Sequence, residues 1–492
     1  MLKERSELKF EARHKGFSYQ LQAIEAVKSL PYAALFHEQG LGKTKIGLDL
    51  AMEWLKSNTI DSVVIVTKRG LIQNWIEEIK THTYLSARIL GQNRQSNFFS
   101  LNSPSRIYLT HYEAVKSEER RLSLFLKTRR VGAILDEAHK IKNPDSDVAK
   151  VFHRISPQFE RKVIMTGTPV ANRPYDLWSQ VYFLDAGQSL GRDFKEFQKQ
   201  LDLSNDLWAD EEKREAFERT LSTTFEKISK FSVRQRKDSA GIDLPEKIVE
   251  NVIVELAPRQ KFLYQQYKTE LQASIIQDGQ QISDDAEEAL KRLLRLVQVA
   301  SNPALIDDSY DEEPGKFSKL SELVDRAVKR TEKTIVWTSF VYNAEWLRKK
   351  LRAHGSVAIS GGMTHEDRIA SVKAFKEDPD CKVLIATPGA AKEGLTLTVA
   401  NHAVFYDRSF SLDDYLQAQD RIHRISQKQT CFIWNLLGRD TVDEWVDSLL
   451  AAKRLSAQLA QADISLSEYK RLANYDFGKT VREILGLGGD EE

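Results

Sequence analysis

Short runs of β-branched and other apolar residues alternate with helix-patterned segments in both halves of the chain, and this alternation constrains the fold most. The run from Val63 to Val66, for example, is followed by apolar residues at helical spacing: Leu71, Ile72, Trp75, Ile76 and Ile79. Similar runs occupy 33–36, 106–110, 131–135, 162–165, 334–337, 357–359, 382–386 and 403–406. Strands that alternate with helices form parallel sheets covered on both faces. The sequence therefore predicts an α/β fold with two parallel-sheet lobes, and helical protrusions within 188–230 and 258–300.

Composition narrows the class of protein. At 492 residues the chain is long enough for roughly three domains. Lys and Arg number 72 against 71 Asp and Glu, so the formal charge of +1 excludes a histone-like polycation. Any nucleic-acid binding would rest on local basic stripes. Only two cysteines are present, Cys381 and Cys431, which excludes a disulfide framework and a four-cysteine zinc module.

The sequence carries no sign of a membrane segment. No apolar run approaches about 18 residues, and residues 1–13 are rich in charged side chains. We therefore expect a soluble intracellular protein without signal peptide or membrane contact. It would reside in the cytoplasm or nucleoid, or in the nucleus of a eukaryote.

A glycine-rich turn, Gly40-Leu41-Gly42-Lys43-Thr44, connects the apolar run at 33–36 to a helix-patterned segment. Such a turn directs free backbone N–H groups at a phosphate, and the helix dipole favours the anion. In a phosphate loop, Lys43 would reach the β- and γ-phosphates of a nucleotide and Thr44 would hold Mg²⁺. The standard pattern has glycine at position 37, where this chain has His37. The alternative interpretation is an ordinary glycine turn without a ligand.

Two carboxylates follow the apolar run at 131–135, in the sequence Asp136-Glu137-Ala138-His139. This position puts them at the C-terminal edge of a sheet, where open α/β sheets bind ligands. Asp136 would hold Mg²⁺, and Glu137 would orient and deprotonate an attacking water. The alternative is a solvated acidic helix start, because carboxylates favour helix N-termini.

The segment 417–424 carries a third candidate group. On a helix, Gln417, Arg421 and Arg424 share one face. Two guanidiniums on a rigid helix would clamp a phosphoryl group as charge develops on it. The alternative is a surface helix with exposed Arg–Asp pairs, which contribute little to stability.

These segments resemble the motifs of helicase superfamily two, in the order in which that superfamily has them. Residues 40–44, 136–143 and 166–169 are similar to motifs one, two and three, and 136–139 has the letters of the DEAH-box type. Residues 421–427 closely resemble the sixth motif of the Swi/Snf (Snf-two) family, and Phe17-Ser18-Tyr19-Gln20 resembles its adenine-recognising glutamine motif. The resemblance extends from about residue 17 to residue 444, so the chain resembles a near-minimal motor core of this family.

The resemblance implies two RecA-like lobes that bind ATP and Mg²⁺. The first lobe would supply Gln20, Gly40, Leu41, Gly42, Lys43, Thr44, Asp136 and Glu137, and the second Gly394, Gln417, Arg421 and Arg424. Of these, the catalytic residues would be Lys43, Asp136, Glu137, Arg421 and Arg424. Thr44 and Asp136 would hold the metal. Nucleic acid, usually duplex DNA in this family, would be contacted at Thr67, Lys68, Thr110, Ser339 and Thr387.

The same resemblance suggests a division of the chain. Residues 1–186 would form the first lobe and 187–230 its helical protrusion, followed by an inter-lobe linker at 231–254. Residues 255–315 would form the helical protrusion of the second lobe, 316–465 that lobe, and 466–492 a helical tail. Two departures from the family pattern stand out: motif five at 387–397 lacks its usual pair of glycines before Asn-Leu, and Ser426 replaces the glycine of motif six.

Three functions are compatible with these observations. The leading hypothesis is a DNA-stimulated ATPase that translocates along duplex DNA and remodels protein–DNA complexes or branched DNA, as a monomer targeted by a protein partner. The second is a strand-separating DNA or RNA helicase, which is disfavoured because 394–413 is too short for a hairpin wedge. The third is a DNA-binding scaffold with a decayed ATPase, against which the intact Lys43 and Glu137 argue.

Overall fold

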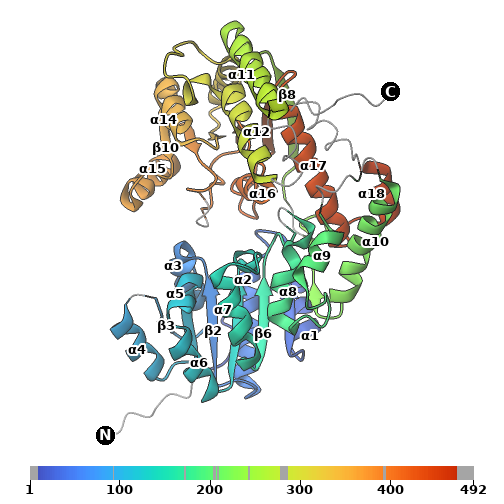
Figure 1. Cartoon of the computed structure of the whole chain (residues 1–492). Helices are drawn as coiled ribbons and strands as arrows, with labels where there is room; N and C mark the ends of the chain where they lie inside the picture. Colours follow the sequence, from blue (N-terminus) through green and yellow to red (C-terminus); the bar gives the residue numbers. More distant parts are fainter. Residues whose placement is uncertain are drawn as a thin grey trace. The chain divides into compact units, whose positions relative to one another are not determined.

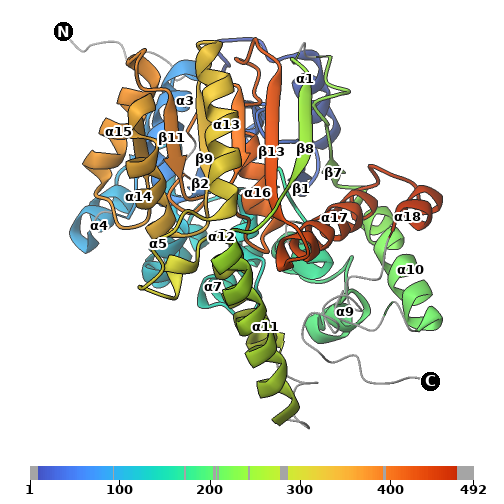
Figure 2. The ribbon, with the colours of Figure 1, turned by 90° about the horizontal axis from the view of Figure 1, so that it is seen from above.

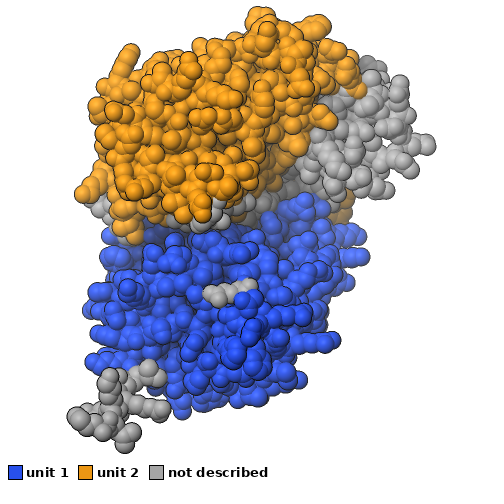
Figure 3. All heavy atoms as spheres, turned by 90° about the vertical axis from the view of Figure 1, so that its left-hand side faces the viewer, with its two compact units in different colours: residues 1–203, 215–242, 456–466 blue, residues 204–214, 243–455, 467–492 orange. Residues whose placement is uncertain are grey.

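The computed structural model describes residues 9–91, 93–170, 173–202, 207, 210–241, 244–277, 286–391 and 395–473. They form two compact units, coloured separately in Figure 3. The first unit comprises residues 1–203, 215–242 and 456–466, and the second comprises 204–214, 243–455 and 467–492. Each unit is built on one sheet, which has seven strands in the first unit and six in the second. The predicted fold class, two parallel-sheet α/β lobes, is confirmed.

The first sheet has the strand order β3-β4-β2-β5-β6-β1-β7. Its strands are β1 (Tyr32–Leu35), β2 (Ser62–Thr67), β3 (Ala87–Ile89), β4 (Ile107–His111), β5 (Val131–Asp136), β6 (Arg161–Met165) and β7 (Ser232–Val233). All the described pairs are parallel; in register, Val63 of β2 lies opposite Ile107 of β4 and Gly132 of β5. Every residue of β2 and of β5 is buried, as expected for central strands covered on both faces.

Helices α1 (Ser18–Val27), α2 (Lys43–Lys56) and α3 (Ile72–His82) share one hydrophobic core with alternate residues of this sheet (Figure 1). The remaining helices of the first unit's central region are α4 (Arg94–Asn102), α5 (Tyr112–Ser117), α6 (Glu119–Lys127), α7 (Asp147–Ile155) and α8 (Leu177–Asp185). Helix α5 contacts β4, and α8 contacts β1 and β6. Short 3-10 turns lie at Arg69–Leu71, Ala138–Ile141, Ser156–Gln158 and Pro174–Asp176.

The second sheet has the strand order β10-β11-β9-β12-β13-β8. Its strands are β8 (Lys247–Val254), β9 (Thr334–Trp337), β10 (Ser356–Ile359), β11 (Val383–Ala386), β12 (His402–Phe405) and β13 (Cys431–Gly438). Helices α13 (Gly315–Lys329) and α14 (Val341–Lys350) pack on one face, where α13 contacts β13 and β8 (Figure 2). Helices α15 (His365–Glu377) and α16 (Leu412–Gln419) contribute to the core on the other face.

The helical segments expected at 188–230 and 258–300 are present in the described residues. The first contains α9 (Phe194–Gln200) and α10 (Glu211–Ile228), and the second contains α11 (Pro258–Gln277) and most of α12 (Ala286–Ser301). Residues of α12 pack with α17 (Val442–Ala460) in a separate apolar cluster. The second unit also contains two short 3-10 turns, at Pro303–Leu305 and Arg352–His354. Helix α18 (Leu466–Leu472) follows α17.

The range 231–254, expected as a linker, contains β7 at its start and β8 at its end, one in each sheet. The predicted domain boundaries otherwise remain predictions, and most of the predicted tail, 474–492, lies outside the described residues. Over the described part of the chain, none of the helices combines the length and the apolar character needed to cross a membrane.

Candidate active site

The glycine turn connects β1 to α2, as the sequence predicted. Gly40 and Gly42 both have positive φ angles, of 86° and 70°, which glycine adopts without strain. A Cβ on Gly42 would also lie 2.5 Å from the amide nitrogen of Gln20. Lys43 begins α2, and its Nζ donates to the carbonyl oxygens of His37 at 2.9 Å and Glu38 at 3.3 Å. The lysine therefore reaches across the loop that its own backbone helps to form.

Two side chains of the glutamine motif, on α1, donate hydrogen bonds to this loop. The Nε2 of Gln20 donates to the carbonyl oxygen of Leu41 at 3.2 Å, and its Oε1 accepts from the backbone N–H of Phe17 at 2.9 Å. The Tyr19 hydroxyl donates to the same Leu41 oxygen at 3.1 Å. Gln20, predicted to belong to an adenine-recognising motif, is thus in contact with the glycine turn. The Tyr19 contact is one that the sequence did not suggest.

The two carboxylates lie at the C-terminal end of β5. Oδ2 of Asp136 accepts hydrogen bonds from the Trp75 indole N–H at 2.8 Å and from the Thr67 hydroxyl at 3.1 Å. The Tyr112 hydroxyl donates to the backbone oxygen of Asp136 at 2.7 Å. Glu137 has a φ of 54°, a left-handed conformation uncommon outside glycine and typical of strained functional positions. Sequence reasoning treated Trp75 only as an apolar core residue, so its polar contact with Asp136 was missed.

Electrostatic interactions connect these carboxylates to the lysine of the loop. Burial, and then the negative charge of Glu137, raise the pKa of Asp136, while the Trp75 hydrogen bond and the Lys43 charge oppose the rise. Burial also acts to raise the pKa of Glu137, but contact with His139 and the charges of Lys68 and Lys43 outweigh it, so the net pKa is lowered. Glu137 is therefore an ionised carboxylate at neutral pH. Oε2 of Glu137 lies 3.2 Å from Nδ1 of His139.

Asp136 offers a carboxylate oxygen, the kind of ligand that Mg²⁺ takes beside a nucleotide, and Thr44 remains a predicted ligand. The side-chain hydrogen bonds from Thr67 and Trp75 both fall on Oδ2 of Asp136 and not on Oδ1. Within the described ranges, no group of three or more His, Cys, Asp or Glu side chains converges on a metal position. Mg²⁺ at nucleotide sites needs only one or two carboxylates besides the phosphates, so such a group is not required.

The second unit holds Gln417 and Arg421 together. Both side chains are 3% exposed, and both line a small pocket of about 10 Å³ with Trp337 and Pro388. Gln417 donates to Asp413 at 2.7 Å, and Arg421 donates to the carbonyl oxygen of Leu395 at 3.4 Å. Gly394, the remaining predicted nucleotide ligand of this unit, lies outside the described residues.

The prediction of one helix across 417–424 is wrong. Helix α16 ends at Gln419, and Arg421 and Arg424 lie on the turn that follows it. This turn is held by Gln427, whose buried amide donates to the carbonyl oxygens of Ile422, Ala400 and Thr398. Arg424 does not line the pocket of Gln417 and Arg421; its guanidinium donates to the Asp420 carbonyl oxygen at 2.8 Å and to the Thr396 hydroxyl at 3.0 Å.

The residues predicted to contact nucleic acid lie at or just after the C-terminal ends of parallel strands. Thr67 ends β2 and Thr110 lies on the neighbouring β4, but both side chains are buried. Lys68 is half-buried beside them. In the second unit, Ser339 follows β9 and Thr387 follows β11. Their roles therefore remain predictions, and at the buried threonines the side chain does not face solvent.

Asp407 organises the loop that carries Ser339, a feature that sequence reasoning missed. Its carboxylate accepts from the Ser339 backbone N–H at 2.6 Å and from the hydroxyls of Thr338 and Ser301, both at 2.7 Å. The available signal was a charged residue two positions after the end of the buried strand β12, because a buried carboxylate must find several donors.

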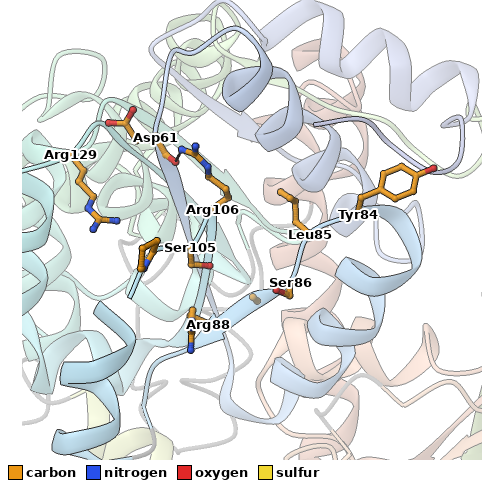
Figure 4. A pocket seen from close by; sticks show the side chains of 10 residues that line it. Asp61, Tyr84, Leu85, Ser86, Arg88, Ser105, Arg106 and Arg129 are labelled. Atoms are coloured by element: carbon orange, nitrogen blue, oxygen red, sulfur yellow. Dashed lines mark hydrogen bonds between the residues drawn. The ribbon is translucent and has the colours of Figure 1, made fainter. Parts of the chain in front are cut away.

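A separate open pocket of about 740 Å³ lies on the first unit (Figure 4). Its lining includes Asp61, Tyr84, Arg88, Arg106 and Arg129. Asp61, Arg106 and Arg129 precede the starts of β2, β4 and β5, whereas the glycine turn, Thr67 and Asp136 lie at strand ends. In a parallel sheet these are opposite edges, so this pocket is distinct from the site of Lys43 and Asp136.

The buried side chain of His37, just before the glycine turn, should make the free energy of unfolding depend on pH. It is 2% exposed, and burial followed by the positive charge of Lys43 lowers its pKa to about 4. The unfolded chain takes up this proton near pH 6.5, so the free energy of unfolding should fall as pH is lowered from about 6.5 to about 4, by up to about 3 kcal/mol. Chemical unfolding at several pH values checks this expectation. His37→Gln should flatten the decline, and identical pH profiles for both proteins would contradict it.

The chain matches two family models. The model of the SNF2-related domain matches residues 25–305, and the model of the helicase conserved C-terminal domain matches residues 315–426. The matched ranges contain the glycine turn, the carboxylates and the Arg421 turn described above.

Similar proteins include an uncharacterized ATP-dependent helicase of Mycoplasma pneumoniae, 25% identical over 449 residues that cover 89% of this chain and 41% of that protein. The DNA repair and recombination protein RAD54-like of Danio rerio is 25% identical over 471 residues, covering 85% and 62%. The chain thus spans only part of these relatives. A solved structure, the Sulfolobus solfataricus SWI2/SNF2 ATPase core in complex with dsDNA, is similar at 24% identity and a TM-score of 0.42, covering 95% of this chain and 99% of that one. Because the SNF2-related model spans more than half of the chain, the protein belongs to the SNF2 family of helicase superfamily two.

Proposed function

We propose that this protein hydrolyses ATP when stimulated by DNA and uses the reaction to translocate along duplex DNA, remodelling protein–DNA complexes or branched DNA. The observation that carries this proposal is the grouping of Lys43, Asp136 and Glu137 at the C-terminal edge of one parallel sheet, where the positive charge of Lys43 acts on both carboxylates; burial still raises the pKa of Asp136, whereas the net pKa of Glu137 is lowered. The sequence at 136–139 supports the DEAH-box subtype.

In the proposed reaction, the backbone N–H groups of residues 40–44 bind the phosphates, and Gln20 reads the adenine beside them. Thr44 and Asp136 would hold Mg²⁺, which would neutralise phosphate charge. Glu137, ionised by its surroundings, orients the attacking water and accepts its proton. Lys43 binds the β- and γ-phosphates as a point charge.

The second unit is proposed to complete the reaction during turnover. Arg421 and Arg424 would stabilise the charge that develops on the transferred phosphoryl group, with Gly394 and Gln417 as further nucleotide contacts. Arg421 is held by its neighbours in a buried pocket, which suits a guanidinium that must be positioned before it acts.

Duplex DNA is the proposed track. The RAD54-like relative is named for DNA repair and recombination, which supports DNA as the polymer. A contact is proposed at Lys68 through its side chain. At Thr67, Thr110, Ser339 and Thr387 the proposed contact is through the backbone, because the three threonines and the hydroxyl of Ser339 are buried. We further propose that the protein acts as a monomer on DNA and that a protein partner targets it.

Steady-state ATP hydrolysis with matched amounts of duplex DNA, single-stranded DNA and RNA tests this function. We expect the duplex to stimulate most, with the stimulation weakening as salt rises from about 50 to 200 mM because phosphate contacts release counterions. Lys43→Ala gives the background rate. Equal stimulation by single strands together with displacement of an annealed strand would favour the helicase alternative, and no hydrolysis with any polymer would favour a scaffold.

A further inference from the structure

We propose that Trp75 is a positioning residue for the magnesium-binding carboxylate, because its indole N–H holds Oδ2 of Asp136 and turns Oδ1 toward the metal. This inference rests on the proposed function, since it assumes that Asp136 binds Mg²⁺ beside a nucleotide. It assigns a role to a residue that does not itself touch the nucleotide.

The geometry around Asp136 is specific. The indole nitrogen of Trp75 lies 2.8 Å from Oδ2, well within the range of an N–H···O hydrogen bond. Trp75 is 2% exposed and Asp136 is 7% exposed, so water does not compete freely for this bond. An indole has a single donor and no acceptor, so its orientation fixes which carboxylate oxygen it occupies.

A second donor reinforces the same orientation. The Thr67 hydroxyl, itself fully buried, lies 3.1 Å from the same Oδ2. With two donors on one oxygen, rotation of the carboxylate would break both bonds, so Oδ1 is the oxygen left for a metal. Partners of this kind fix the direction of a metal ligand, and their loss typically weakens metal binding 10- to 100-fold.

Both donors come from one connection of the first unit. Thr67 ends β2, a short turn follows at Arg69–Leu71, and Trp75 lies one turn into α3. The predicted nucleic-acid contact Lys68 lies between the two donors in sequence. A displacement of this connection would therefore reach Asp136 directly, through two hydrogen bonds.

The alternative is that Trp75 only fills the core, and Trp54 provides the matched comparison. Trp54 belongs to the same hydrophobic cluster and is also 2% exposed. Its indole N–H donates instead to the backbone oxygen of Lys28 at 3.2 Å, away from Asp136. Replacing either residue by phenylalanine removes the same atoms and one buried donor, so the two variants differ in the bond to Asp136.

The test measures the affinity of the intact chain for a fluorescent ATP analogue, with and without Mg²⁺ and without DNA. We expect Trp75→Phe to reduce the apparent affinity for Mg²⁺ about tenfold while leaving binding of the metal-free analogue unchanged. Trp54→Phe should match the wild type. Thr67→Val, which removes the other donor, should shift the Mg²⁺ dependence in the same direction and serves if Trp75→Phe does not fold.

The outcomes distinguish failure of the positioning role from failure of the nucleotide site. If the wild type binds the analogue with a clear Mg²⁺ dependence, and Trp75→Phe and Thr67→Val both behave as Trp54→Phe does, the positioning role is overturned while the nucleotide site stands. If the wild type shows no Mg²⁺-dependent binding, the proposed nucleotide site fails, and the positioning role fails with it.

Discussion

Replacing Glu137 with glutamine should lower the kcat for ATP hydrolysis by about 10²- to 10⁴-fold, while the chain still binds ATP and DNA. The amide keeps the size of the side chain but cannot accept a proton from water. In the wild type the surroundings of Glu137 keep it charged and so able to accept a proton, with His139, Lys68 and Lys43 together outweighing the cost of burial, whereas the glutamine side chain has no charged form. Phosphate release at saturating ATP and duplex DNA gives kcat, and equilibrium binding of a fluorescent nucleotide shows that the site is intact.

Glu53→Gln is the matched control for this variant. Glu53 lies on the exposed side of α2, in the same unit, and should tolerate the same change without loss of turnover. Normal turnover in Glu137→Gln would refute its assignment as the base. Loss of nucleotide binding in that variant would mean that Glu137 holds the site together rather than acting on water.

Replacing Arg421 with alanine should abolish most of the DNA-stimulated turnover, by about 10³- to 10⁵-fold in kcat, with nucleotide binding retained. The reason is that a guanidinium fork stabilises charge that appears only as the phosphoryl group is transferred. Arg421→Lys keeps the charge but not the fork, so we expect it to recover only a small part of the rate. The measurement is single-turnover hydrolysis beside equilibrium binding of nucleotide.

Because Arg421 is buried and donates to the backbone of Leu395, its loss also affects the second unit itself. Thermal unfolding of each variant separates this effect from catalysis, and the exposed Arg352 provides a control in Arg352→Ala. A folded Arg421→Ala protein that retains DNA-stimulated turnover would remove this residue from the catalytic set.

The central strands could be predicted because their pattern is strong. Residues of β2 and β5 are buried on both faces, so their sequences are nearly unbroken apolar runs that stand out from the helices around them. The edge strand β8 and its neighbour β13 were not predicted. Polar Asn251 and Asn435 interrupt these runs, and only the fold shows that the two side chains bond to each other at 2.8 Å.

The positions of the glycine turn and of the two carboxylates could also be predicted, because each is a short local motif whose place follows from the strand before it. The contacts that orient Asp136 could not, since Thr67, Trp75 and Tyr112 are separated from it in sequence and meet it only through packing. The helical periodicity at 417–424 gave a wrong prediction, because α16 ends at Gln419 and contacts with distant residues help to hold the turn that follows. The turn after α16 is held by the Gln427 amide, which donates to Ile422 nearby and to Ala400 and Thr398, both distant in sequence.

The most direct test of a DNA-driven nucleotide motor compares phosphate release by the wild-type chain with and without saturating duplex DNA, at one stated salt concentration, with Lys43→Ala measured alongside. We expect phosphate release that depends on both the duplex and Lys43. Release that is equal with and without the duplex, or that persists in Lys43→Ala, would contradict it.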